Sequence, residues 1–447
     1  MLLGRIGARV SRETSVFVAT FTIVLGLVLV AASFLTAHER VTRFGTALMP
    51  DFAAMYLAGE ILNDHGPTRL YDFPLQEEVR RAQFPQSPAA ERLPYVYAPW
   101  FAWFWRPFAM LPYEAAGALW LATSLAMMLA GFACLARACP EIARRDMALV
   151  ALVALSFEPF LFECWANGQV SSFPFLCVSA ALALERSGRP VAAGMVLALL
   201  TYKPMQPPLL FALLLLGARW RTLAGIALGG LGLFAISAAL HGPAIVIEYP
   251  QRLLEYGRLV SPSDSGGAQL RLWKYTDLQT AARLLGPPLE SMALVVAVPV
   301  ALYFLGALVR LWRRSGDGWA DSTRHAWAAT LVLLPVLNFY FAVYDVVIAI
   351  PGVLLAATLL VRRDRLSAPA VPGTNHGGEA ATPVQPSGRL PDSFLGVVAL
   401  VYLAGLLTPT FGAIRVNLLT LALLVLGWYV LRIPGQDGPA ASARQLA

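Results

Sequence analysis

Apolar runs of close to 20 residues recur along the whole of this 447-residue chain, and they constrain its fold more than any other feature. A run of about 20 apolar residues is long enough to cross the hydrocarbon core of a bilayer as a helix. Charged residues make up only 14% of the chain, against about 25% in an ordinary soluble protein. The sequence therefore predicts an all-α, polytopic transmembrane protein, and it argues against nucleic-acid binding, secretion and disorder for the chain as a whole.

Thirteen segments are candidate spans, and about twelve are expected to cross the membrane. The first is longer than the apolar region of a signal peptide and lacks a convincing cleavage site, so we expect it to be retained. The segment at 97–111 is short, aromatic and interrupted by prolines, which favours an interfacial or partly inserted helix. The candidates lie at about 14–36, 97–111, 115–136, 147–163, 170–184, 191–203, 205–218, 222–240, 291–312, 326–343, 345–361, 393–409 and 416–431.

The distribution of charge predicts the orientation. Two long loops, 38–95 and 241–290, hold 11 Lys and Arg against 13 Asp and Glu. The shorter junctions hold 20 Lys and Arg against 10 Asp and Glu, and they lie at 1–13, 137–146, 185–189, 219–221, 310–324, 362–392 and 432–447. Because basic residues mark cytoplasmic loops, we expect a plasma-membrane protein with both termini in the cytoplasm and both long loops outside. Residues 97–137 must then cross an odd number of times, unless the junction at 137–146 breaks the pattern.

The same pattern divides the chain into four parts. Residues 1–361 form the predicted transmembrane bundle with its two outer loops. Residues 362–392 contain five prolines and four glycines, a composition typical of a flexible linker. Two further transmembrane helices are expected at 393–433, followed by a cytoplasmic tail at 434–447.

The first outer loop carries the most informative carboxylate, Asp51. It stands at the start of a segment in which Phe52, Met55, Gly59 and Leu62 follow helical spacing, so we expect an amphipathic helix lying on the membrane surface. A second helix is expected at about 74–83. An aspartate in this position most often caps its helix. The alternative is a carboxylate at the water–lipid boundary that faces a cavity.

Four ionisable residues interrupt apolar segments at the same predicted outer side. Such groups cost free energy in a membrane and usually line cavities, although a charge at a helix end can also reach the interface. The second outer loop adds Arg271-Leu-Trp-Lys274, where cations suited to phosphate stand beside an aromatic ring suited to a sugar. The four residues are Glu158, Glu163, Lys203 and Asp345.

No motif of another chemistry is present. The five histidines have no metal-ligand spacing, and the four cysteines lack zinc-type or redox-type spacing, which favours small core residues. We therefore expect neither a metal nor a cofactor.

Six short motifs stand in an order and spacing that resembles glycosyltransferase family 87 of the GT-C superfamily. The likeness runs from about residue 14 to about residue 361. The chain has Tyr-Ala-Pro where this family usually has Tyr-Pro-Pro, and Lys-Pro-Met-Gln where it usually has Lys-Pro-Gln. The motifs are Asp51-Phe52, Tyr97-Ala-Pro99, Asn167-Gly-Gln169, Lys203-Pro204, Arg219-Trp-Arg221 and Tyr344-Asp345.

The resemblance implies a GT-C bundle and a reaction. Such enzymes transfer a sugar, often mannose, from a polyprenyl phosphate to an acceptor hydroxyl outside the membrane, with inversion. Asp51 matches the position of the family's general base. The implied partners are a polyprenyl-phosphate-linked sugar donor, a lipid or glycan acceptor and membrane lipids, with no nucleic acid.

The residues fit that chemistry. A single displacement needs one carboxylate near the acceptor hydroxyl and cations that offset the charge of the leaving phosphate. We expect Lys203, Arg271 and Lys274 to bind the donor phosphate, and the other expected binding residues are Tyr97, Asn167, Gln169, Gln206, Tyr344 and Asp345. A transporter or flippase of lipid-linked sugars is the alternative, although it predicts polar residues along the spans from both sides. A membrane scaffold with a vestigial site is a third possibility.

Overall fold

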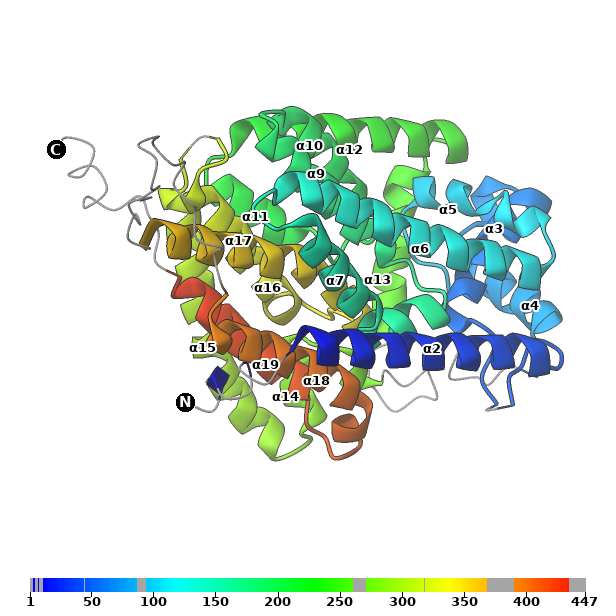
Figure 1. Cartoon of the computed structure of the whole chain (residues 1–447). Coiled ribbons are helices and arrows are strands. Elements are labelled where there is room, and N and C mark those ends of the chain that lie inside the picture. The colour runs from blue at the N-terminus through cyan, green and yellow to red at the C-terminus, as the bar shows by residue number, and fades with distance from the viewer. Residues whose placement is uncertain are drawn as a thin grey trace, which may run out of the picture.

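The computed structural model describes residues 11–43, 45–86, 94–259, 271–316, 318–367 and 390–433, together with three positions before residue 11. Within these ranges the regular structure is all helical, as predicted (Figure 1). The α-helices are α2 (Arg12–Thr36), α3 (Pro50–Asp64), α4 (Phe73–Gln83), α5 (Pro99–Trp105), α6 (Tyr113–Ala138), α7 (Arg144–Leu155), α8 (Glu158–Phe160), α9 (Ser172–Arg186), α10 (Pro190–Ala198), α11 (Pro208–Leu216), α12 (Trp220–His241), α13 (Ile245–Leu259), α14 (Leu278–Leu284), α15 (Leu289–Arg314), α16 (Asp321–Leu337), α17 (Ala349–Ser367), α18 (Asp392–Ala413) and α19 (Leu418–Leu431). Short 3-10 or π turns are η1 (Pro67–Arg69), η3 (Phe108–Met110), η4 (Leu161–Ala166), η5 (Leu199–Tyr202), η6 (Leu272–Lys274) and η7 (Val343–Ile348).

The described helices include several that suit a membrane. Six are long and apolar enough to cross one, by length and composition, and a seventh is added if α7 and the segment Glu158–Ala166, bent by 60°, form one broken span. This supports a polytopic membrane bundle, and the count of about twelve spans stays a prediction. The six are α2, α6, α12, α15, the segment Val343–Leu366 and α18.

The aromatic segment at 97–111 is too short to cross a membrane. It forms the seven-residue α5, followed by the single turn η3. The next helix, α6, is 26 residues long and is a candidate span. The stretch 97–138 therefore contributes one long apolar helix. This agrees with an odd number of crossings in this stretch, which the predicted orientation requires.

Basic junctions that are distant in the sequence meet at one end of the molecule. Arg12 at the start of α2 lies 3.6 Å from Asp146 at the start of α7. Glu141, in the loop that precedes α7, forms ion pairs with arginines of three other junctions, Arg186, Arg324 and Arg362. Five of the seven junctions that charge counting assigns to one side of the membrane are thus neighbours in the fold.

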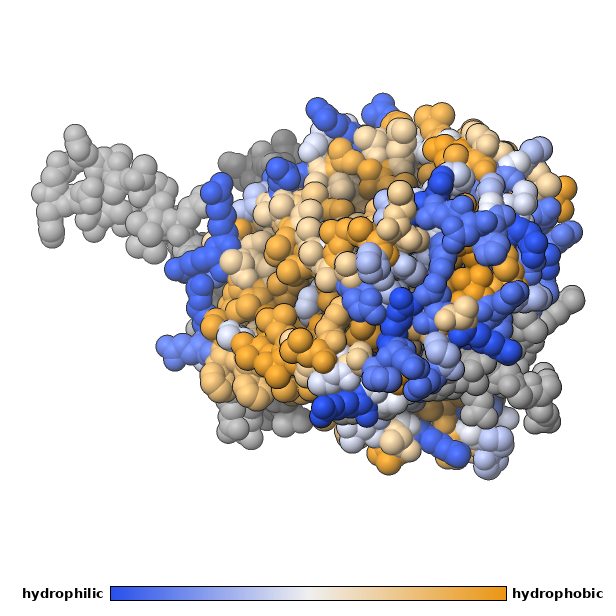
Figure 2. Space-filling model, turned by 90° about the vertical axis from the view of Figure 1, so that its right-hand side faces the viewer, coloured by the Kyte–Doolittle hydropathy of each residue, from blue (hydrophilic) through white to orange (hydrophobic). Residues whose placement is uncertain are grey.

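The helices of the first outer loop lie together at another end. In Figure 1, α3 and α4 of this loop, together with the α5 that follows it, gather on the right, above the right-hand part of α2. Figure 2 looks onto this end, where hydrophilic residues cover one part of the surface and a broad hydrophobic area lies beside them. Two large hydrophobic clusters build the interior, one inside the bundle and one aromatic cluster around α3, α5 and α6, and Trp165 and Phe173 pack against both.

Helix α3 is a helix as predicted, but the expectation that it lies on the membrane surface is wrong. Nine of its residues are buried, on more than one face. The ring of Phe52 lies within about 6 Å of the rings of Tyr56, Trp105 and Tyr113. Because α5, η3 and α6 cover the faces that would otherwise meet lipid or water, α3 is an internal element. The predicted helix at 74–83 is confirmed as α4.

Part of the predicted organisation lies outside the described residues. This applies to residues 368–389, most of the predicted linker, and to 434–447, the predicted tail. After this interval α18 and α19 return to the bundle and pack against each other, and α19 packs against α16.

The predicted orientation can be tested by thiol labelling. Glu78 on α4 and Arg145 on α7 are both exposed, so a cysteine at either position is accessible to a reagent. We expect a membrane-impermeant maleimide to label Glu78→Cys in intact cells, and Arg145→Cys only after the membrane is opened. Both variants would carry Cys134→Ser, because the other three cysteines are buried. The reverse labelling pattern would contradict the predicted orientation.

Candidate active site

Asp51 is held at the start of α3 by the backbone of a distant turn. The carbonyl oxygen of Asn167 accepts hydrogen bonds from the backbone N–H groups of Asp51 and Phe52, at 3.2 and 3.3 Å. The N-cap residue, Met49, has left-handed backbone angles and makes no side-chain capping bond. The Asn167 carbonyl therefore satisfies N–H groups that a cap would otherwise serve. Asp51 does not cap its own helix, so the capping interpretation is wrong.

The turn that supplies this carbonyl needs a glycine at its centre. Gly168 has φ +74°, and a Cβ atom there would lie 2.5 Å from the Cβ of Phe52 and 2.8 Å from the Cε of Met49. Its carbonyl accepts a hydrogen bond from the indole of Trp120 at 2.9 Å. Positive φ is cheap only for glycine, and the missing side chain lets the turn approach α3. The turn follows the π-helix η4, a form of helix that is frequent at functional sites.

Gln169 joins this turn to the Tyr97 segment. Its Oε1 accepts from the hydroxyl of Tyr97 at 3.3 Å and from the backbone N–H of Val170 at 2.9 Å. Tyr97 stacks on Tyr202 with ring centroids 5.7 Å apart, and the N–H of Ala98 donates to the Tyr202 carbonyl at 2.9 Å. The segments that carry Tyr97, Gln169 and Lys203 are therefore side by side.

Lys203 forms an ion pair with Asp345, whose side chain is 2% exposed. Asp345 also accepts a hydrogen bond from the hydroxyl of Ser171 at 2.6 Å. The Lys203 ammonium lies 4.9 Å from the ring centre of Tyr344, close enough for a cation–π contact. Ser171 was not singled out from the sequence, where only its position two residues after Gln169 hints at a role.

Lys274 forms a second ion pair, with Glu163 of η4, at 2.7 Å. Its ammonium lies 5.4 Å from the ring centre of Trp273. Both lysines of the chain thus already have a carboxylate partner.

The charges of both ion pairs act on the Asp51 carboxylate. Burial raises its pKa to about 6, Lys274 and Lys203 oppose the rise, and Glu163 and Asp345 add to it. Among the residues that the structure describes, the Asp51 carboxylate has no hydrogen-bond or ion-pair partner of its own. Unlike the carboxylates of Glu163 and Asp345, which are paired with lysines, it is free to take a proton from a ligand.

Two other residues expected at the site stand apart from this network. Arg271 is exposed and pairs with none of the described side chains. Gln206 is 3% exposed, its carbonyl accepts from Asn338 at 3.0 Å, and neither polar atom of its side chain has a partner. The described residues also contain no group of three His, Cys, Asp or Glu side chains arranged to hold a metal ion.

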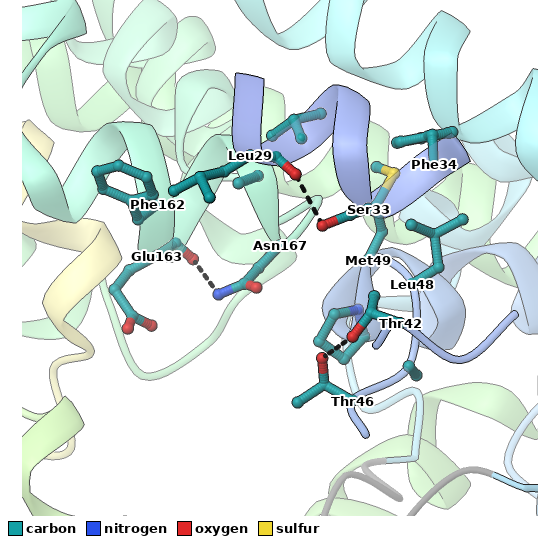
Figure 3. Close-up of a pocket in the computed structure, with 14 residues that line it drawn as sticks. Leu29, Ser33, Phe34, Thr42, Thr46, Leu48, Met49, Phe162, Glu163 and Asn167 are labelled. Atoms are coloured by element: carbon teal, nitrogen blue, oxygen red, sulfur yellow. Dashed lines mark hydrogen bonds between the residues drawn. The ribbon is translucent and has the colours of Figure 1, made fainter. Parts of the chain in front are cut away.

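A cavity of about 270 Å³ opens beside the start of α3 (Figure 3). Glu163 and Asn167 lie on one side of it, Thr42 and Thr46 on the other, and α2 contributes both apolar and hydroxyl side chains. Pro50, the neighbour of Asp51, is part of its wall. The remaining lining residues are Leu29, Val30, Ser33, Phe34, Ala47, Leu48, Met49, Phe162 and Ala166.

The fold and this cluster define a helical membrane protein with a buried, charge-balanced polar site. A comparison with protein-family models matches glycosyltransferase family 87 over residues 95–336, more than half of the chain. The chain belongs to glycosyltransferase family 87 and is a membrane glycosyltransferase. Neither the comparison with curated proteins nor that with solved structures found a match. Tyr97, Asn167, Lys203 and Lys274 fall inside the matched residues, whereas Asp51 precedes them.

The Lys203–Asp345 pair yields a stability prediction. Lys203→Gln leaves the buried Asp345 carboxylate without its cation. We expect the free energy of unfolding to fall by up to about 3 kcal/mol. This is the lower end of the range for buried pairs, because Lys203 is partly exposed. The double variant Lys203→Gln with Asp345→Asn should recover most of the melting temperature in detergent, because no unpaired charge remains. A double variant as unstable as the single one would contradict this account of the pair.

Proposed function

We propose that this glycosyltransferase transfers a hexose, with mannose as the expected sugar, from a polyprenyl-phosphate donor to an acceptor hydroxyl on the outer side of the plasma membrane. Transfer inverts the anomeric carbon, and Asp51 is the general base. The observation that carries the proposal is the free Asp51 carboxylate. The Asn167 carbonyl binds the backbone of Asp51, and the charges of two lysine–carboxylate pairs act on its side chain.

The proposed reaction is one displacement. Asp51 takes the proton of the acceptor hydroxyl while that oxygen attacks the anomeric carbon. The bond from this carbon to the phosphate oxygen breaks, and its electron pair leaves with the polyprenyl phosphate. A carboxylate with a pKa near 6 is a suitable base close to neutral pH, because it is mostly ionised there and still accepts a proton.

The two lysines support the departure of the phosphate. In the resting site their charges are balanced by Glu163 and Asp345, so a lysine need not remain as a bare cation away from water. An incoming phosphate shares each lysine with its carboxylate partner, and the exposed Arg271 supplies a cation without a described partner. Charge that grows on the leaving phosphate strengthens these contacts in the transition state.

The cavity beside the start of α3, whose wall includes Pro50, the neighbour of Asp51, supports an amphipathic substrate. Its α2 wall presents Leu29 and Phe34, while Thr42, Thr46 and Asn167 line other parts. A molecule with a sugar and a lipid tail meets both kinds of surface. This agrees with a lipid-linked donor or acceptor that enters from the membrane beside α2.

Replacement of Asp51 tests the assignment of the base. In proteoliposomes supplied with a radiolabelled polyprenyl-phosphate mannose and a membrane-lipid acceptor extract, we expect Asp51→Asn to lower the transfer rate by about 10²–10⁴-fold, the usual contribution of a general base. The matched control is Asp64→Asn, which removes an exposed carboxylate at the other end of α3 and should keep the wild-type rate. Full activity of Asp51→Asn at equal expression would refute the assignment. Movement of label across the bilayer without a glycosidic product would instead favour the flippase.

The pKa of Asp51 predicts how the rate of sugar transfer depends on pH. The base form is lost as the pH falls through about 6, so we expect kcat/KM to rise between pH 5 and 7 and then level. The wild-type enzyme would be measured over this range in the same proteoliposomes, with Asp64→Asn as the control profile. A flat profile between pH 5 and 7 would count against Asp51 as the titrating base.

A further inference from the structure

We propose that the C-terminal hairpin α18–α19 positions the active site by fixing the Lys274 segment against the Glu163 and Asp345 segments, with Thr420 as a positioning residue. This inference rests on the proposed function. The hairpin lies outside the residues that match the family and follows the predicted linker, and neither helix contributes a residue expected to bind substrate.

The hairpin holds the backbone that carries Lys274. The hydroxyl of Thr420 donates to the carbonyl of Thr276 at 2.8 Å, and the Asn417 amide donates to the carbonyl of Tyr275. These are the two carbonyls that follow Lys274 in the chain. The Asn417 side chain also accepts from the N–H of Thr420 at 3.1 Å, so one cap joins the start of α19 to the Lys274 segment.

A close helix contact adds to these hydrogen bonds. A Cβ atom on Gly412 of α18 would lie 2.5 Å from the Cβ of Trp273. Trp273 immediately precedes Lys274 and lies beneath its ammonium group. Contacts from α18 and α19 therefore fix the segment on both sides of Lys274.

The same hairpin also contacts the bend between α7 and the segment that carries Glu163. A Cβ on Gly405 would lie 2.6 Å from the Cε2 of Phe157 and 3.0 Å from the Cδ of Pro159. The hydroxyls of Ser156 and Tyr402 are 2.9 Å apart. These contacts surround the 60° bend between α7 and the Glu158–Ala166 segment, which orients η4 and with it Glu163.

One face of α18 makes both sets of contacts. Tyr402, Gly405 and Gly412 follow spacings of three and seven residues, which place them along one side of a helix, and the three span about 15 Å at 1.5 Å per residue. A third hydrophobic cluster packs Leu419 and Leu423 of α19 against Val343 and Val346, the residues that flank Tyr344 and Asp345. The hairpin thus supports three of the four segments that supply charges around Asp51, the fourth being the segment of Lys203.

Because it holds the Lys274 segment, the hairpin fixes the position of one of the charges that act on Asp51. Lys274 is the charge that most lowers the pKa of Asp51, so a loosened Lys274 segment raises that pKa. The titratable and charged groups that face Asp51 are Lys274, Lys203, Glu163 and Asp345, with the phenols of Tyr97, Tyr113, Tyr275 and Tyr344.

Two threonines of the hairpin form a matched pair for the test. Thr420 and Thr408 are both 1% exposed, but the hydroxyl of Thr408 donates to the carbonyl of Ala404 in its own helix. Thr420→Val removes a bond to the Lys274 segment, and Thr408→Val removes only a local bond. Thr420→Ser keeps the hydroxyl and is the rescue variant.

The kinetic readout uses the full-length protein in proteoliposomes with polyprenyl-phosphate mannose. We expect Thr420→Val to lower kcat by about tenfold, within the roughly 10²-fold that a misplacement of about 1 Å can cost, and to move the midpoint of the pH profile upward. Thr408→Val and Thr420→Ser should keep the wild-type kcat and midpoint. Equal kinetics in Thr420→Val and Thr408→Val would overturn the proposal.

Hydrogen exchange supplies a readout that needs no substrate. In detergent-solubilised full-length protein, peptides that cover 271–277 should exchange faster in Thr420→Val than in wild type or Thr408→Val. Unchanged exchange there would overturn the positioning role. Full activity of Asp51→Asn would overturn the proposed function, while the exchange result would still decide the role of the hairpin.

Discussion

The hydrogen bonds from the first turn of α3 to the Asn167 carbonyl connect the two halves of this molecule. One partner is the start of an internal helix in the first outer loop, and the other is a turn at the end of a π-helix inside the bundle. Other contacts also join the aromatic cluster to the bundle, such as those of Trp165 and Phe173, but these two hydrogen bonds hold the backbone of Asp51 and Phe52. With them, Asp51 is held beside side chains from η4, η6 and η7. Gly168 makes the contact possible, because a side chain there would collide with Phe52.

Charge balance explains why each lysine of the site is paired with a carboxylate. An isolated charge is costly in a low-dielectric interior, and the cost falls when an opposite charge and further hydrogen bonds satisfy it. Lys203 and Lys274 each have a carboxylate, and Asp345 has the Ser171 hydroxyl as well. The site can therefore fold before a substrate arrives. Asp51 lacks such a partner among the described residues, and its raised pKa is the physical result of burial.

The sequence predicts the membrane class, the helix at 74–83 and the segments that meet at the site, because periodicity and scarce charges are local signals. It does not predict the burial of α3, since the Phe52 stripe has the same spacing whether lipid or α5 covers it. It also does not predict that Lys274 pairs with Glu163, 111 residues away in the chain. Ser171 carries no pattern of its own, so its hydrogen bond to Asp345 becomes evident only in the fold. The family motifs identify these segments in the sequence, but they do not specify which side chains form pairs.

Some of the residues around Asp51 lie within the part of the chain that matches the family, and others lie outside it. Asn167, Lys203 and Lys274 lie within the matched residues, whereas Asp51 and Asp345 lie before and after them. The side chains that support Lys274 come later still, from α19, after an interval of 22 residues between the described ends at 367 and 390. Long intervals cost little extra loop entropy as they lengthen, so a late hairpin can stabilise an early site provided its docking is specific. Asn417 and Thr420 supply that specificity because they bind backbone carbonyls, whose positions fix the Lys274 segment whatever the identity of the side chains around it.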